Sequence, residues 1–191
     1  MKPPFILASG SPRRAQLLRE LELDFSVVVS DAPEAEHEHL TARELAQLNA
    51  YRKAHAVAKL HPQAVVLGAD TVVCLGTRHF GKPRDIKEAI EMLRALSGQI
   101  HQVVTGCCLA LLEDHRCRIF SDQTAVRFLK LNTTTIHRYL RSINPLDKAG
   151  GYAIQEHAGL IVDRITGSFT NVMGLPTEVL VEELKVFGIV D

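Results

Sequence analysis

Apolar runs alternate along this chain with segments in which apolar residues recur every three or four positions. The runs are typical of buried β-strands, and the spaced pattern is typical of amphipathic helices. Strands are predicted at residues 5–8, 25–29, 64–73, 103–112, 117–129, 152–155 and 160–165. Helices are predicted from residue 12 onward, and at 41 to about 60, 85–96, 133 to about 142 and 176 to about 187. This order predicts an α/β fold, and because the chain has no repeat or linker we expect one folded domain over residues 1–191.

Local signals mark where three of these helices begin. Ser11 is a good N-cap and Pro12 a good first helical residue, since proline has no N–H to leave unbonded. Thr41 and Glu44 fit the capping-box pattern, in which each side chain bonds the other residue's backbone N–H. Asp85 is a suitable cap for the next helix. These signals support the predicted helix starts independently of the apolar periodicity.

Composition limits the classes of partner. Hydrophobic residues make up 46% of the chain and charged residues 23%, which is ordinary for a globular protein. Lys and Arg total 22, as do Asp and Glu, so the net charge is zero. Proteins that bind nucleic acid or anionic membranes over a broad surface have a clear basic excess. We therefore expect neither kind of partner, although a local basic pocket for one small anion remains compatible with this composition.

Targeting signals and cysteine usage indicate the compartment. The apolar run near the N-terminus is too short for a signal peptide, and no stretch approaches the roughly 18 residues of a membrane span. Cys74, Cys107, Cys108 and Cys117 form no CxxC pair, so they suggest neither a zinc site nor a redox motif. Three of them occur in apolar, strand-like contexts and are expected to be buried thiols. A cytoplasmic location follows.

The segment from Ser9 to Arg14 has the features of an anion site. A strand ends, Gly10 turns the chain, and a capped helix begins with Arg13 and Arg14 in its first turn. The positive end of the helix dipole lies there, so two arginines destabilise the helix unless an anion joins them. Free N–H groups and two guanidinium groups together make a polyphosphate cradle. The alternative is that both arginines are solvated surface charges.

Asp70 is the best single candidate for catalysis. Gly68-Ala69-Asp70-Thr71 is expected to interrupt a strongly apolar strand, and a carboxylate buried there without a partner would be costly. It needs a cation, a metal ion or a water network, which suits a metal ligand or a base that orients water. A strand-end aspartate that faces solvent is the alternative.

Lys82 follows a sequence that partly matches a P-loop. The match runs from Gly76 to Lys82, but Pro83 stands where the Mg²⁺-binding Ser or Thr belongs and breaks the direct entry into a helix. We therefore reject a P-loop. Lys82 remains a plausible point charge on phosphate, although a surface lysine is the simpler interpretation.

Three weaker signals remain. Two glycines in the block at 147–155 allow close backbone approach, and the Gln155 amide could read the edge of a uracil or thymine ring. A turn followed by a short strand explains that block equally well. The cluster at 34–39 has metal-capable side chains; a solvated acidic loop is the default, with one carboxylate reaching the cleft as a second metal ligand. Lys53, taken alone, would be a surface residue.

Together these motifs resemble the Maf family of nucleotide pyrophosphatases over nearly the whole chain. No single block is specific, but six in this order and spacing are. The blocks are LASGSPRRAQLL at 7–18, GADTVV at 68–73, GKPRD at 81–85, LSGQIHQVVTG at 96–106, DKAGGYAIQ at 147–155 and GSFTNVMGLP at 167–176.

The resemblance implies a mixed, twisted sheet with flanking helices and two lobes around a central cleft, similar to inosine triphosphate pyrophosphatases. It implies hydrolysis of a nucleoside triphosphate to the monophosphate and diphosphate, a Mg²⁺ or Mn²⁺ cofactor and a homodimer. Asp70 then matches the catalytic proton acceptor, and with Glu34 it would hold the metal ion. Phosphate-contacting positions are matched by Ser9, Arg13, Arg14, Lys53 and Lys82, and positions linked to substrate choice by Arg13, Thr71 and Gln155.

Within the family, the sequence resembles the branch that hydrolyses dTTP and UTP. A branch acting on 7-methyl-GTP typically has Trp in the first block and GSDQ in the second, whereas this chain has Arg13 and Thr71 there. One departure is Arg52, where relatives often have Glu; if that Glu binds metal, the metal here depends on Asp70 and Glu34. Modified pyrimidine nucleotides remain open as substrates. So does a regulatory role in cell division, because the family was first linked to inhibition of septum formation.

Overall fold

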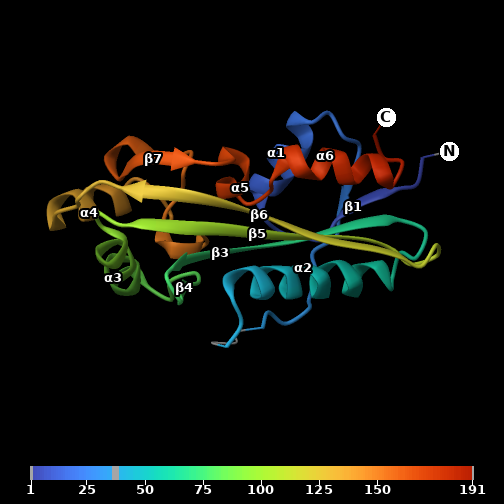
Figure 1. Ribbon diagram of the computed structural model, residues 1–191, viewed down its shortest axis with the longest axis horizontal. Helices are drawn as coiled ribbons and strands as arrows, with labels where there is room; N and C mark the ends of the chain where they lie inside the picture. The colour runs from blue at the N-terminus through green and yellow to red at the C-terminus, as the bar shows by residue number, and fades with distance from the viewer. Residues whose placement is uncertain (1, 36–38, 191) are drawn as a thin grey trace.

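One mixed sheet organises the molecule (Figure 1). The computed structural model describes residues 2–35 and 39–190 of the 191-residue chain. The strand order is β2-β1-β3-β5-β6-β7, with β4 paired to β3. β1 runs parallel to β2 and β3, and all other pairs are antiparallel. The strands are β1 (Phe5–Leu7), β2 (Ser26–Val27), β3 (Val65–Leu75), β4 (Arg78–Phe80), β5 (Ile100–Leu111), β6 (Arg116–Phe128) and β7 (Val162–Thr166).

Helices cover both faces of this sheet, which confirms the predicted α/β fold. Figure 1 shows α2 on one face, α1, α5 and α6 on the other, and α3 and α4 near one end of the long strands. The helices are α1 (Pro12–Glu20), α2 (Ala42–Ala58), α3 (Ile86–Leu96), α4 (Thr133–Leu140), α5 (Phe169–Met173) and α6 (Thr177–Val186), with 3₁₀ turns η1 (Ala149–Gly151) and η2 (Ala158–Leu160).

The predicted helix starts are confirmed. Ser11 occupies the N-cap position of α1, although its side chain makes no capping hydrogen bond, and Pro12 is the first residue of the helix. The capping box of α2 is complete: Glu44 N–H donates to the Thr41 hydroxyl, and Thr41 N–H donates to the Glu44 carboxylate. Asp85 accepts a hydrogen bond from the first turn of α3. These caps depend only on residues within one turn of chain, which is why sequence alone predicted them.

Two strand predictions are wrong. β3 is not interrupted at Gly68–Thr71, because β5 pairs with it through all four residues and supplies the ladder partners. Residues 152–155 are not a strand. There the Ala153 N–H and carbonyl both bond the hydroxyl of Tyr139 instead of a neighbouring strand. The sequence analysis also missed β4 and α5, which are three and five residues long.

Two glycines let α2 lie directly on the sheet. A Cβ atom on Gly68 of β3 would lie 2.2 Å from the Ala50 carbonyl oxygen, and one on Gly106 of β5 would lie 2.4 Å from the Ala46 carbonyl carbon. The contact face of α2 carries alanine at every fourth position, at 46, 50 and 54, and all three are fully buried. Small residues on both sides therefore bring the helix backbone against the middle of β3 and β5, beside Asp70.

The cysteine and membrane expectations can be compared with the structure. Cys74, Cys107 and Cys108 are buried thiols, as predicted, and Cys117 is exposed. Within residues 2–35 and 39–190, no helix combines the length and the apolar composition needed to cross a bilayer.

Candidate active site

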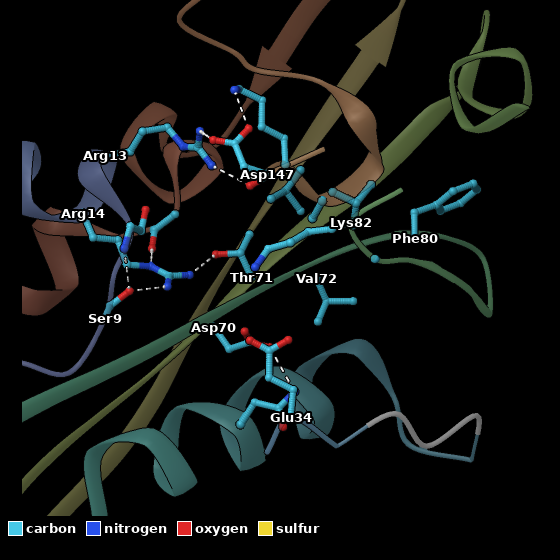
Figure 2. A pocket seen from close by; sticks show the side chains of 18 of the residues that line it. Ser9, Arg13, Arg14, Glu34, Asp70, Thr71, Val72, Phe80, Lys82 and Asp147 are labelled. Atoms are coloured by element: carbon cyan, nitrogen blue, oxygen red, sulfur yellow. Dashed lines mark hydrogen bonds and ion pairs between the residues drawn. The ribbon is translucent and has the colours of Figure 1, made fainter. Parts of the chain in front are cut away.

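A single cleft of about 1230 Å³ contains the residues that the sequence analysis selected (Figure 2). Its walls come from the β1–α1 turn, the middle of β3, one side of α2, the loop after β4, and the segment at 147–155. These elements are distant in the chain, so the sheet and its helices are what assemble the site. The predicted residues lining it are Ser9, Arg13, Arg14, Glu34, Lys53, Asp70, Thr71, Lys82 and Gln155.

Asp70 lies in the interior of β3 and is only 9% exposed, which excludes a solvent-facing strand end. Both of its carboxylate oxygens have partners. Lys53 Nζ lies 2.7 Å from Oδ1, and Asn49 Nδ2 donates to Oδ2 at 3.1 Å. A buried carboxylate needs such a cation and donor, as expected from the cost of burying charge. The sequence analysis missed Asn49, although its spacing of four from Lys53 places both on one side of α2.

Lys53 is not a surface lysine, because its ammonium lies between two carboxylates. Besides Asp70, it contacts Glu34 Oε1 at 2.6 Å. Burial acts to raise the pKa of Glu34, but the hydrogen bond and charge of Lys53 outweigh it and hold that pKa below its usual value. Glu34 therefore reaches the cleft from the acidic loop; residues 36–38 of that loop lie outside the described residues.

The Glu34–Lys53–Asp70 arrangement fits a divalent cation only in part. Two carboxylates converge on one positive charge, and carboxylate oxygens are the ligands that Mg²⁺ and Mn²⁺ prefer. Over the part of the chain that the structure describes, no group of three or more His, Cys, Asp or Glu side chains is arranged to hold a metal ion. A cation here would thus need further oxygen ligands from substrate or water, as is usual for Mg²⁺ at phosphate sites.

Arg14 is buried, and its hydrogen bonds hold the Ser9–Arg14 segment against the rest of the cleft wall. Its guanidinium donates to Ser9 Oγ at 3.0 Å, to Thr71 Oγ1 at 3.0 Å and to the Gly174 carbonyl at 2.8 Å. With 9% exposure it is not a solvated surface charge, and burial lowers its pKa. Arg14 thus ties the β1–α1 turn to β3 and to the end of α5, placing Ser9 and Thr71 on either side of one positive charge (Figure 2).

Arg13 points across the cleft to the opposite wall. Its guanidinium donates to the Asp147 carbonyl at 3.3 Å and lies 3.6 Å from Asp147 Oδ2. Asp147 also accepts from the buried ammonium of Lys148 at 2.8 Å. The first turn of α1 and the 147–155 segment are therefore joined by charge, and Arg13 keeps a fifth of its side chain accessible to an anion in the cleft.

Lys82 adds a cation without a P-loop. Gly76 lies in the turn between β3 and β4, and Gly81 follows β4, so the stretch from Gly76 to Lys82 is not a glycine loop that leads directly into a helix. This agrees with the rejection of a P-loop. No hydrogen bond or ion pair joins Lys82 to any residue of 2–35 or 39–190, and its side chain lines the cleft. Its ammonium is thus available to phosphate.

Apolar side chains from β4, α3, β5 and the 152–155 segment also line the cleft. Apolar and aromatic linings of this kind are typical of sites that bind a flat ring. Gln155 lines the cleft from this segment and supplies a polar amide. Sequence reasoning identified Gln155 alone here, because the apolar lining had the same pattern as core. The apolar lining residues are Phe80, Met92, Val103, Tyr152 and Ile154.

Comparisons with known proteins show the family to which this chain is similar. A family model described as Maf-like protein matches residues 4–187. A protein named dTTP/UTP pyrophosphatase from Desulforamulus reducens is 42% identical over 186 residues, covering 97% of each chain. One of the same name from Acetivibrio thermocellus is 44% identical over 191 residues, covering 96% of this chain and 95% of its own. A crystal structure of protein VC0702 from Vibrio cholerae covers 75% of this chain at 11% identity and a TM-score of 0.36.

Proposed function

Because the chain belongs to the Maf-like protein family, we propose that it hydrolyses dTTP and UTP to the nucleoside monophosphate and diphosphate. The observation that carries this proposal is the grouping of Asp70 with Arg13, Lys53 and Lys82 around one cleft. A buried carboxylate beside several cations suits hydrolysis of a polyphosphate, since the cations bind the anion and the carboxylate accepts a proton from water.

Each residue is assigned its role in the reaction by its position in the cleft. Arg13 and Lys82 bind the β- and γ-phosphates from opposite sides of the cleft. Asp70 orients a water molecule for in-line attack on the α-phosphorus and accepts its proton, and diphosphate leaves. Lys53 and Asn49 hold the two oxygens of Asp70 and so fix its orientation. Most of the acceleration comes from positioning and from charge placed in advance of the reaction.

Asp70 and Glu34 are the residues that would hold Mg²⁺ or Mn²⁺, because they are the carboxylates that converge on the Lys53 ammonium. When bound, such an ion supplies charge neutralisation and Lewis acidity at the phosphate oxygens. The neighbouring Arg52 offers no oxygen ligand, and so the protein contributes few ligands of its own.

The substrate preference rests on Arg13, Thr71 and Gln155. Thr71 lies beside the buried Arg14, and its hydroxyl is also 3.0 Å from that of Thr105. Gln155 lines the cleft together with the apolar side chains of the 152–155 segment, and its amide would read the edge of a pyrimidine ring bound there. The enzyme is expected to act in the cytoplasm as a homodimer.

The test is a screen of canonical and modified nucleoside triphosphates with Mg²⁺ or Mn²⁺, with diphosphate and orthophosphate measured separately. We expect diphosphate as the first product and the highest kcat/KM for dTTP and UTP. Orthophosphate as first product would refute cleavage between the α- and β-phosphates. A preference for 7-methyl-GTP would refute the pyrimidine assignment. A protein that binds nucleotide without turnover would point instead to the regulatory role in cell division.

A further inference from the structure

The segment Tyr152–Gln155 lines the cleft without belonging to a helix or a strand. Regular strands are held by ladder hydrogen bonds along their length. Here that ladder is missing, yet Tyr152, Ala153 and Ile154 are all buried, so their polar backbone groups need other partners. The position of the segment Tyr152–Gln155 thus depends on the groups that form hydrogen bonds with its main chain.

The hydroxyl of Tyr139 satisfies both main-chain groups of Ala153. It donates to the Ala153 carbonyl at 3.0 Å and accepts from the Ala153 N–H at 2.9 Å. A phenol carries one donor and can accept as well, so one side chain replaces two ladder bonds. Tyr139 belongs to α4 and is fully buried, so water cannot compete for its two hydrogen bonds to Ala153.

A second buried bond holds the same segment one residue earlier. The Tyr152 hydroxyl lies 2.8 Å from Nε2 of His101, a buried residue of β5. The rings of His101, Phe128 and Tyr152 pack edge to face with centroids 4.8 to 5.5 Å apart. The segment is therefore held from behind by α4 and β5, and its opposite side remains available to a ligand.

We propose that Tyr139 is a positioning residue for base recognition, acting through the backbone of Ala153 on the segment that carries Gln155. This inference rests on the proposed function of the cleft. Tyr139 itself is not one of the residues that line the cleft, so it acts only through this segment. Recognition of a base edge by hydrogen bonds is sensitive to displacements well below 1 Å, and a displaced amide loses discrimination before it loses chemistry.

The test is Tyr139→Phe, which keeps the ring and removes only the hydroxyl. In steady-state assays of diphosphate release, KM for UTP and dTTP should rise about 3- to 10-fold while kcat changes less than about 2-fold. The ratio of kcat/KM for UTP to that for CTP should fall by at least about 3-fold. The matched control is Ser142→Ala, which removes a hydroxyl bonded to the Tyr139 carbonyl but not to Ala153. It should keep the wild-type KM and selectivity.

A merely structural role predicts another pattern. Partial unfolding lowers kcat through the active fraction and leaves KM and the UTP:CTP ratio unchanged, and that result would overturn the proposal. If Tyr139→Phe does not fold, amide hydrogen exchange on the wild-type protein is the test. The Ala153 N–H should be strongly protected from exchange. Exchange at the rate of an exposed amide would refute the hydrogen bond to Tyr139 on which the proposal rests. If the wild type hydrolyses no nucleotide, the proposed function fails. UTP and CTP affinities measured by calorimetry then still test Tyr139.

Discussion

Lys53 Nζ lies 2.7 Å from Asp70 Oδ1 because α2 rests directly on β3, with Gly68 beneath the Ala50 carbonyl. The ammonium also contacts Glu34 at 2.6 Å, so one lysine pairs with two carboxylates in the cleft. The position of the Asp70 carboxylate thus depends on the packing of a helix on a sheet, and changes in either should be measurable in activity.

Replacing Asp70 with Asn removes the proton acceptor and keeps the shape. We expect kcat to fall by at least about 100-fold, the usual size of a general-base contribution. Thermal unfolding should remain cooperative. Asp163→Asn is the matched control, since Asp163 is exposed and pairs only loosely with Arg127 at 3.7 Å. It should retain wild-type turnover; full activity in Asp70→Asn contradicts the assignment.

Replacing Lys53 with Met should raise the pKa of Glu34. Burial favours the protonated form of this carboxyl, and the hydrogen bond and charge of Lys53 reverse that effect in the wild type. A depressed folded-state pKa stabilises the fold above the unfolded value and is lost as pH falls through the folded value. The wild-type contribution is therefore present above about pH 4.3 and is lost as pH falls below that value, whereas in the variant the depression of the pKa, and with it the stabilising contribution, becomes smaller. NMR titration of the Glu34 carboxyl measures its pKa. The control Lys59→Met, at the exposed end of α2, should leave the pKa of Glu34 unchanged.

Replacing Gly68 with Ala should push α2 away from the sheet. The new Cβ would lie within 2.9 Å of three atoms of Ala50 and Ala54, two of them backbone, so a rotamer change cannot relieve the clash. We expect the free energy of unfolding to fall by about 1–3 kcal/mol or more. Activity per folded molecule should also drop, because Lys53 and Asn49 move with the helix. Gly159→Ala is the control, since a Cβ there meets open space; equal activity per folded molecule in both variants argues against the coupling.

His101 should make stability depend on pH below neutrality. Burial lowers the pKa of His101 to about 4 from an ordinary value of 6.5. Between pH 4 and 6.5 the unfolded chain therefore binds more protons than the folded one, and stability rises with pH in that window, by on the order of 3 kcal/mol overall. Urea unfolding across this range should show the slope. The slope of stability against pH should flatten in His101→Gln. It should persist in the control His61→Gln, because His61 is exposed.

Sequence patterns predicted the elements of this fold well where the determinants were local. The cap of α2 and the start of α1 involve residues at most three apart. The segment Ser9–Arg14 was selected for the same reason, because a strand end, a turn and a helix start are contiguous. The role of Gly68 was not visible, since a glycine within an apolar run indicates a break unless the helix lying on it is known.

By itself, the sequence determined the α/β order of elements, their caps, the strand–turn–helix segment at Ser9–Arg14 and Asp70 as a carboxylate in an apolar run that required a partner. Only the tertiary structure decided which partners these are: Lys53 and Asn49 for Asp70, at separations of 17 and 21 residues, and Tyr139 for Ala153, at 14. The physical reason is that a buried polar group must be satisfied, but any nearby donor will serve. Its identity therefore depends on how closely α2 packs on β3 and where α4 ends, which no local pattern encodes.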